Sequence, residues 1–289
     1  RGFALGSRTY HTPPYGLPMA TASPSSARER VLITGGGSGL GLALAQRYAR
    51  EGAQLLIADL DAARAQAAVA GLPGSGHHAF QVDVGDDDSV TALKAQVEAV
   101  VGGVDVLVNN AGIASGGPLL GTDMAEWRRL IEVDLLSVVR GTLAFLPGMV
   151  ERGRGHVVST ASFAGLAGAP GIMSYGVAKA GVVAFSEQLR AEMHGTGVDV
   201  SVLCPAFFRT NLLENFHGDA KVRGMASRMM DKSPDTLDTV GDATYAALRA
   251  RTFLVLPTKH EPMRWRIKRW FPNWYFNKLI ETAGTMRRG

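Results

Sequence analysis

The stretch that decides the fold is Val31-Leu32-Ile33-Thr34-Gly35-Gly36-Gly37-Ser38-Gly39-Leu40-Gly41, an apolar run followed by a glycine-rich turn and a helical pattern. Glycine permits such a tight turn and lets the backbone approach a phosphate closely. A helix that begins there holds a pyrophosphate at its positive end. The spacing is G-x-x-x-G-x-G rather than the better-known G-x-G-x-x-G, and glycines also serve close packing, so the turn alone only favours a dinucleotide site.

Outward from this turn, short apolar runs alternate with longer helical patterns, which is typical of repeated βαβ units. The runs are continuous rather than alternating, which indicates strands covered by helices on both faces. We therefore expect an α/β fold, a doubly wound parallel sheet of about seven strands in a Rossmann-type three-layer sandwich. The expected strands are 31–34, 54–59, 78–82, 104–109, 156–159, 199–203 and 253–256, and the expected helices are about 40–50, 61–70, 89–101, 124–152, 173–194 and 238–251.

The rhythm of the chain predicts a single catalytic domain over residues 30–258, since neither an internal repeat nor a break in composition divides it. Residues 1–29 lack periodicity and contain Met19 as a candidate start, so we treat them as a disordered or foreign segment. Residues 207–233 contain no clear strand and are expected to form a mobile segment that covers the substrate.

Composition narrows the class of protein. Of 289 residues, 46% are hydrophobic and 19% charged, as in ordinary globular proteins. The single cysteine, Cys204, excludes an internal disulfide and suits a structural thiol in a reducing compartment. By inspection of the sequence, no stretch reaches the roughly 18 apolar residues that a membrane span needs, so we expect a cytoplasmic protein. The modest net charge of +4 argues against a nucleic-acid partner, and the scattered histidines argue against a metal site.

An acidic residue ends the second predicted strand. Asp59 follows Gly35 by 24 residues, where a carboxylate can accept both ribose hydroxyls of an adenosine and repel a 2′-phosphate. The glycine turn contains no Arg or Lys, and Leu60-Asp61 follows Asp59, so nothing obvious would neutralise that phosphate. NAD is therefore expected rather than NADP. The alternative is that Asp59 caps the helix that starts near Asp61.

Three residues indicate acid/base chemistry on an alcohol or ketone. Tyr175 and Lys179, four residues apart, share one helical face, so the ammonium can lie near the phenol. A free phenol with a pKa of about 10 is a poor base at neutral pH, and a neighbouring cation stabilises its phenolate. Ser162 can donate a hydrogen bond to the substrate oxygen. Each pattern alone is common on protein surfaces.

The order of these motifs resembles the classical short-chain dehydrogenase/reductase family over about residues 30–257. The resemblance implies an NAD-dependent oxidoreductase that acts on CH–OH groups and forms homodimers or homotetramers. It makes Tyr175 the general acid/base, Lys179 the residue that lowers its pKa and holds the nicotinamide ribose, and Ser162 the residue that positions the substrate oxygen. The cofactor contacts it implies are Gly35, Ser38, Gly39, Leu40, Gly41, Asp59, Leu60, Asp83, Val84, Asn110, Ala111, Gly112, Tyr175, Lys179, Pro205 and Thr210.

One position departs from the family. Asp134 stands where the family has an asparagine that completes a catalytic tetrad, largely through a main-chain carbonyl that holds a water. Aspartate keeps that carbonyl, so Asp134 stays among the candidate catalytic residues. A buried carboxylate would favour a charged Lys179 but cost desolvation. The alternative is a non-catalytic protein that senses NAD with a degenerate tetrad.

Residues 259–289 form a basic, aromatic extension. Six aromatic and four cationic residues lie between positions 264 and 276, and Pro262 and Pro272 predict two short amphipathic helices. Such a cluster must bury its surface somewhere. It can pack on its own core or on a neighbouring subunit, cover an apolar substrate, or lie on a membrane as part of a membrane-peripheral lipid oxidoreductase.

Overall fold

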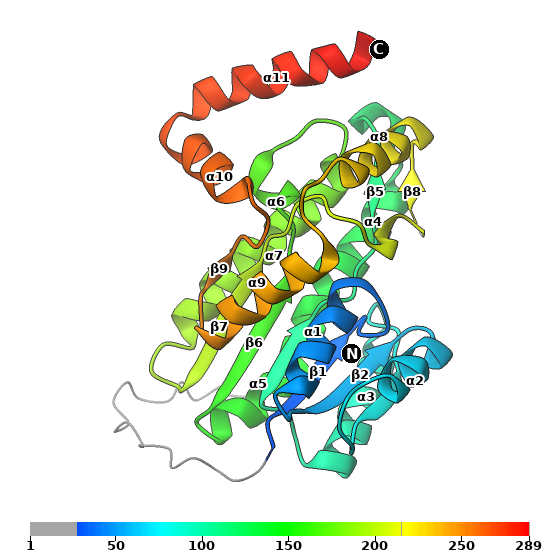
Figure 1. Cartoon of the computed structure of the whole chain (residues 1–289), viewed down its shortest axis with the longest axis vertical. Helices are drawn as coiled ribbons and strands as arrows, with labels where there is room; N and C mark the ends of the chain where they lie inside the picture. The colour runs from blue at the N-terminus through cyan, green and yellow to red at the C-terminus, as the bar shows by residue number, and fades with distance from the viewer. Residues whose placement is uncertain (1–27, 215, 289) are drawn as a thin grey trace, which may run out of the picture.

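Seven parallel strands form the central sheet of the computed structural model, which describes residues 28–214 and 216–288 (Figure 1). The strand order is β3-β2-β1-β4-β6-β7-β9, which confirms the predicted doubly wound fold and its seven strands. The segment predicted to be irregular, 1–29, lies outside the described residues except for positions 28 and 29. The bounds are β1 Arg30–Thr34, β2 Gln54–Asp59, β3 His78–Gln81, β4 Val106–Asn109, β6 Gly155–Thr160, β7 Val198–Leu203 and β9 Leu254–Val255.

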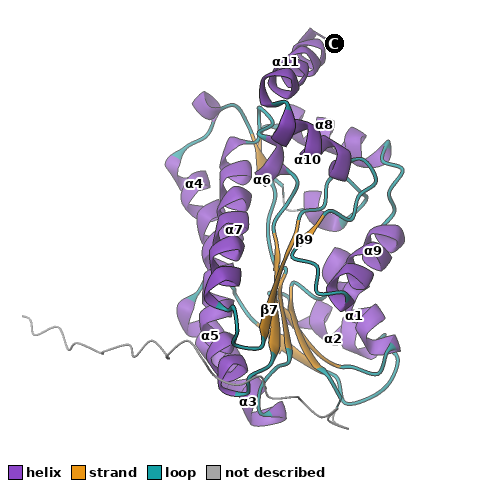
Figure 2. Ribbon diagram, turned by 90° about the vertical axis from the view of Figure 1, so that its left-hand side faces the viewer, coloured by secondary structure: helices purple, strands orange, loops and turns teal. Residues whose placement is uncertain are grey.

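Helices cover both faces of the sheet (Figure 2). Adjacent residues of β1 serve opposite cores, since Ile33 packs in the cluster of Leu44, and Leu32 in that of Phe145. This alternation explains why the strand is apolar throughout. One face carries α1 Gly39–Arg50, α2 Ala62–Ala70 and α9 Leu237–Arg249, and the other carries α3 Asp87–Val101, α4 Met124–Ile131, α5 Ser137–Glu151 and α7 Met173–Glu192.

The topology sets the position of a crevice. β1 pairs with β2 on one side and with β4 on the other, so successive crossovers leave β1 in opposite directions. In open α/β sheets, ligands bind outside the carboxyl ends of the strands at such a switch point. The glycine turn after β1 and the Asn109–Gly112 turn after β4 meet there.

The long helix predicted over 124–152 is interrupted by a π-helical turn, η2 Glu132–Leu136. Such insertions are frequent at functional sites, and this one contains Asp134. By length and composition the whole run Met124–Glu151 is apolar enough to cross a membrane, contrary to the sequence-based expectation. The run instead packs on the sheet, where Val138, Phe145 and Met149 are buried.

The segment between β7 and α9 contains more structure than the sequence predicted. It includes η3 Asn211–Leu213, β8 His217–Gly218 and α8 Ala220–Asp231, and β8 pairs in parallel with β5 Ser115–Gly116. Two-residue strands are too short to produce a periodic signal. The short elements η1 Leu119–Gly121 and α6 Ala164–Ala167 were also missed.

The C-terminal extension forms two helices, α10 Glu261–Trp270 and α11 Pro272–Arg288, which confirms the prediction of two pieces. Pro262 stands in the first turn of α10, and Pro272 begins α11. A proline fits the first helical turn because its missing N–H would have no partner there. Figure 1 shows α11 at one end of the molecule, clear of the sheet.

Candidate active site

The glycine turn between β1 and α1 forms one wall of a large cavity. Gly35 has a φ of +61°, which L side chains rarely adopt. A Cβ atom at Gly41 would lie 2.4 Å from the carbonyl oxygen of Gly35 and 2.6 Å from Nδ2 of Asn110, so only glycine fits. Ser38, the N-cap of α1, makes no side-chain capping bond, and no acidic residue stands in the first turn. The positive end of α1 is thus available to a phosphate.

Asn110 fastens the end of β4 to this turn. Its Nδ2 donates to the carbonyl oxygens of Thr34 and Gly35, at 3.1 and 3.2 Å. The hydroxyl oxygen of Thr34 accepts hydrogen bonds from the backbone N–H groups of Asn110 and Ala111, at 3.0 and 3.2 Å. The Asn110 side chain therefore holds the glycine turn against the end of β4. Asn110, Ala111 and Gly112 also line the cavity.

Asp59 lies at the end of β2 and also lines the cavity. Its Oδ2 accepts a hydrogen bond from the backbone N–H of Gly37 at 3.1 Å, and its Oδ1 accepts one from that of Asp61 at 3.2 Å. The alternative that Asp59 caps α2 is wrong, because the N-cap is Asp61. Each carboxylate oxygen has two acceptor sites, so Asp59 keeps capacity for two ribose hydroxyls.

Arg64 corrects the expectation that nothing near Asp59 would neutralise a 2′-phosphate. A Cβ atom on Gly37 would lie 2.7 Å from Cγ of Arg64 and 2.8 Å from Oδ2 of Asp59, so both side chains reach the same point of the turn. Arg64 also lines the cavity, and its Nε lies 4.0 Å from Asp61. Arg64 could have been predicted from the sequence, because it lies three residues after Asp61, the N-cap of α2.

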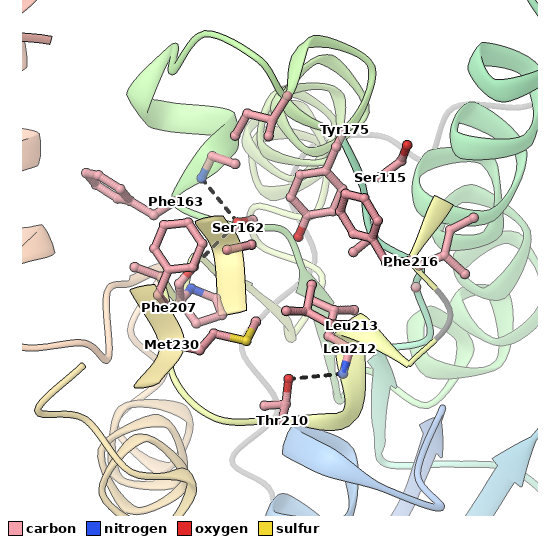
Figure 3. Close-up of a pocket in the computed structure, with 18 of the residues that line it drawn as sticks. Ser115, Ser162, Phe163, Tyr175, Phe207, Thr210, Leu212, Leu213, Phe216 and Met230 are labelled. Carbon is pink, nitrogen blue, oxygen red and sulfur yellow. Dashed lines mark hydrogen bonds between the residues drawn. The ribbon is translucent and has the colours of Figure 1, made fainter. Parts of the chain in front are cut away.

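Tyr175 and Ser162 both line the cavity and lie near each other in its wall (Figure 3). Tyr175 projects from α7, and Ser162 follows β6, where its Oγ accepts a hydrogen bond from the Ala164 N–H at 3.1 Å. Lys179, one turn further along α7, is buried behind the phenol, with Nζ 5.9 Å from the centroid of the Tyr175 ring. That Nζ donates to the carbonyl oxygen of Thr160 at 3.1 Å, which fixes the ammonium next to β6.

Asp134 is fully buried in the π-helical turn. Its Oδ1 accepts a hydrogen bond from the Ile113 N–H at 2.8 Å and lies 3.9 Å from Nζ of Lys179. Its Oδ2 has no hydrogen-bond partner among the described residues. Burial raises the pKa of Asp134, and the charge of Lys179 and the Ile113 hydrogen bond oppose that shift.

All but three of the predicted site residues line the cavity. Gly41, Asp134 and Lys179 do not line the cavity but stand behind residues that do. Asp83 and Val84 line it after β3, where Oδ1 of Asp83 accepts a hydrogen bond from the Gly85 N–H at 2.8 Å. The remaining predicted residues at the wall are Gly35, Ser38, Gly39, Leu40, Asp59, Leu60, Asn110, Ala111, Gly112, Ser162, Tyr175, Pro205 and Thr210.

The cavity extends well beyond these residues, to a volume of about 1620 Å³. Typical pockets for small ligands measure about 300–1,000 Å³, so this cavity is large enough for a dinucleotide and a substrate together. Beyond Tyr175 the wall is apolar (Figure 3). Most of it comes from the segment 207–233, which the sequence predicts to cover the substrate, and from the C-terminal extension, although the individual residues were not predicted. This part is lined by Phe163, Phe207, Leu212, Leu213, Phe216, Met225, Met229, Met230, Ile267 and Tyr275.

The family of the chain follows from comparison with known proteins. A family model described as short chain dehydrogenase matches residues 29–221. The chain belongs to this family. Its relatives include the meso-2,3-butanediol dehydrogenase of Serratia marcescens, and an NAD(P) cofactor is typical of the family.

Two curated relatives of this short-chain dehydrogenase differ in how much of their own length it covers. It is 35% identical over 233 residues to the probable oxidoreductase EphD of Mycobacterium tuberculosis, a match that covers 76% of this chain but only 39% of that protein. It is 34% identical over 236 residues to the cis-4-hydroxycyclohexanecarboxylate dehydrogenase of Sinomonas cyclohexanicum, covering 78% of this chain and 92% of that protein.

Solved structures of other short-chain dehydrogenases share the fold. One from Burkholderia phymatum in complex with NAD is 27% identical, with a TM-score of 0.78 over 84% of this chain and 93% of that one. Another from Sphingobium yanoikuyae in complex with NADPH is 28% identical, with a TM-score of 0.70 over 82% and 91%. The two cofactors leave the choice between NAD and NADP to the residues of this chain.

Electrostatics at Tyr175 bear on how a short-chain dehydrogenase of this sequence works. Burial, and then the charge of Asp134, raise the pKa of Tyr175 above its ordinary value, and a contribution from the Ser162 hydroxyl opposes them. Phenolate is thus disfavoured in the protein alone. Any cation next to the ring, including Lys179, works in the opposite direction.

Cys204 lies directly before the segment Pro205–Thr210 and is buried. Burial raises the pKa of its thiol to about 12, so it stays protonated at neutral pH. This environment suits the structural thiol expected from the sequence. The cytoplasmic location stays a prediction.

Proposed function

We propose that this chain is an NAD-dependent dehydrogenase or reductase that interconverts an apolar secondary alcohol and its ketone. The observation that carries the proposal is the convergence of Tyr175 and Ser162 on one cavity wall, with the ammonium of Lys179 behind the phenol. The test is turnover: purified protein is mixed with NAD and a panel of hydrophobic secondary alcohols, and NADH absorbance is followed. Absence of turnover across the panel, with NAD bound, would favour the NAD-sensing alternative.

The roles of the side chains follow from their positions. The bound cofactor supplies the acceptor or donor of the hydride at the substrate carbon. Tyr175 exchanges a proton with the substrate oxygen, because its hydroxyl reaches the cavity. Ser162 donates a hydrogen bond to that oxygen in this proposal. Its Oγ accepts from the Ala164 N–H, and its proton, which is directed at the Pro205 carbonyl oxygen over a long 3.5 Å, turns to the substrate. Lys179 holds positive charge beneath the phenol and thereby stabilises phenolate.

The residues fit a nicotinamide dinucleotide. The open end of α1 suits the pyrophosphate, and the lone pairs of Asp59 suit the adenosine ribose. The carboxylate favours NAD, whereas Arg64 beside it offers a cation for the 2′-phosphate of NADP. We place NAD first because Asp59 itself contacts the glycine turn and Arg64 is shared with Asp61.

The NAD-sensing alternative draws its support from Asp134, whose buried carboxylate disfavours the Tyr175 phenolate. Replacing Asp134 with Asn removes that charge and keeps an acceptor for the Ile113 N–H. The pKa of Tyr175 should therefore fall, and the pH at which alcohol oxidation rises should move down with it, by an amount on the order of one unit. The pH profile of kcat/KM measures it.

Asp88→Asn removes an equal charge from an exposed site at the start of α3 and should leave that profile in place. A profile for Asp134→Asn that moves upward would show that Asp134 acts mainly by keeping Lys179 charged. An unchanged profile would show that Asp134 is already protonated in the working enzyme.

We also propose a homodimer or homotetramer that pairs α5 and α7 with their copies. Leu143 and Val150 of α5 and Val177 of α7 are exposed apolar side chains on these helices. Leu143→Asp should place a charge in that interface and shift the protein to a smaller species in light scattering after size exclusion, with an unchanged circular dichroism spectrum. The same species as the unaltered protein would argue against this pairing.

A further inference from the structure

The C-terminal helix pair, α10 and α11, contacts the body of the enzyme at defined points. The indole of Trp265 packs against the core cluster that includes Phe163 and Leu166. Nζ of Lys268 donates to the carbonyl oxygen of Leu166. Tyr275 and Leu279, one turn apart on α11, line the cavity beyond Tyr175. The pair is thus seated on the enzyme, and α11 forms part of the cavity wall.

The outer surface of this helix pair is aromatic. Among residues 28–214 and 216–282, every exposed Trp, Phe or Tyr side chain belongs to it. The exposed fractions are 77% for Trp270, 65% for Phe271 and 59% for Phe276, and Met263 and Ile280 are also exposed. Trp274, which is 54% exposed, also lines the cavity. Soluble proteins rarely leave such contiguous apolar surface in water, so this surface has an occupant.

The positive charge of the helix pair indicates what kind of surface covers it. Residues 259–289 contain eight Lys and Arg against two Glu, a formal charge of +6, whereas the other 258 residues carry −2, since the whole chain carries +4. A second copy of the same surface would bring like charges together, which disfavours a homodimer through this face. Exposed indoles among cations match the interface of an anionic bilayer, where rings sit at the headgroups.

We propose that α10 and α11 dock the enzyme on an anionic phospholipid surface, with the part of the cavity wall that α11 forms beside that surface. The aromatic side chains enter the headgroup region, and Arg266 and Arg269, both exposed, attract the anionic lipids. Because Tyr275 and Leu279 line the cavity from the same helix, an apolar substrate dissolved in the bilayer has a short path to Tyr175. This last step, unlike the docking, rests on the proposed dehydrogenase function.

The experiment measures sedimentation of the full chain with phosphatidylcholine vesicles that contain or lack phosphatidylserine. We expect binding to the anionic vesicles that high salt weakens, and quenching of tryptophan fluorescence by brominated lipid, since Trp265, Trp270 and Trp274 lie in the pair. The triple variant Trp270→Ser, Phe271→Ser and Phe276→Ser alters exposed positions and should lower the vesicle partition coefficient by about tenfold or more.

The matched control is Leu119→Ser with Leu120→Ser, which removes exposed apolar surface elsewhere and should leave vesicle binding unchanged. Equal binding by the triple variant, or no preference for phosphatidylserine, would overturn the docking proposal. So would a smaller oligomer in the triple variant without vesicles, which would assign the face to a second copy. Vesicle binding by a protein that lacks turnover would leave docking intact and remove the proposed reaction instead.

Discussion

Replacement of Tyr175 by Phe is expected to lower kcat for alcohol oxidation by about a thousandfold, within the range of 10²–10⁴ that positioned acid/base groups contribute. The variant loses the only proton that the phenol can exchange with the substrate oxygen, while the ring keeps its place on α7 beside Lys179. Fold and cofactor affinity should remain, because the glycine turn and Asp59 are untouched. Initial rates with NAD and an active secondary alcohol measure the loss.

A matched control comes from the same cavity. Tyr275 also lines it, but from α11, far along the chain from the residues that surround Tyr175. Tyr275→Phe removes an equivalent hydroxyl and should keep kcat within a factor of a few, with its effect confined to KM for apolar substrates. If Tyr175→Phe retained more than about a tenth of the activity, the acid/base assignment would be wrong.

The sheet could be predicted because its signals are local. In β1, alternate residues such as Leu32 and Ile33 enter separate cores, so the strand is apolar at every position and stands out in the sequence. The turn at Gly35 and Gly41 could be predicted because close backbone approach excludes every other residue type. Both signals can be read within a dozen residues of sequence, although the contacts behind them reach Asn110 and Phe145.

The substrate half of the site could be predicted only as two candidate segments, 207–233 and 259–289, because the constraints that shape it act across the fold. β5 and β8 are joined by pairing of Ser115 with His217, about a hundred residues apart, and neither strand is long enough to produce a pattern. The π-helical turn at Asp134 also has no sequence signal here, because Met124–Glu151 reads as one continuous helix. Only the packed structure reveals that this carboxylate lies 3.9 Å from Nζ of Lys179, and that one of its oxygens has no hydrogen-bond partner in the part of the chain that the structure describes.

Because Arg64 lies beside Asp59, the preference for NAD over NADP is best tested by replacing Asp59. The unaltered protein should bind NAD at least about tenfold more tightly than NADP, because the Asp59 carboxylate accepts from ribose hydroxyls and repels a 2′-phosphate. Asp59→Ala should reverse this by about one to two orders of magnitude, as the repulsion disappears and Arg64 is left beside the phosphate position. Dissociation constants for NAD and NADP, from titration of each variant, measure the change.

Two further variants separate the loss of the Asp59 charge from the loss of its hydrogen bonds to the glycine turn. Asp59 also accepts hydrogen bonds from the N–H groups of Gly37 and Asp61, so alanine loosens the turn as well as removing charge. Asp59→Asn keeps one carbonyl acceptor and should show the same change in preference with a smaller loss of NAD affinity. Arg64→Gln added to Asp59→Asn should then weaken NADP about tenfold and leave NAD nearly unchanged, because only the phosphate needs the guanidinium. Comparable affinities for NAD and NADP in the unaltered protein would mean that Arg64, rather than Asp59, decides the cofactor.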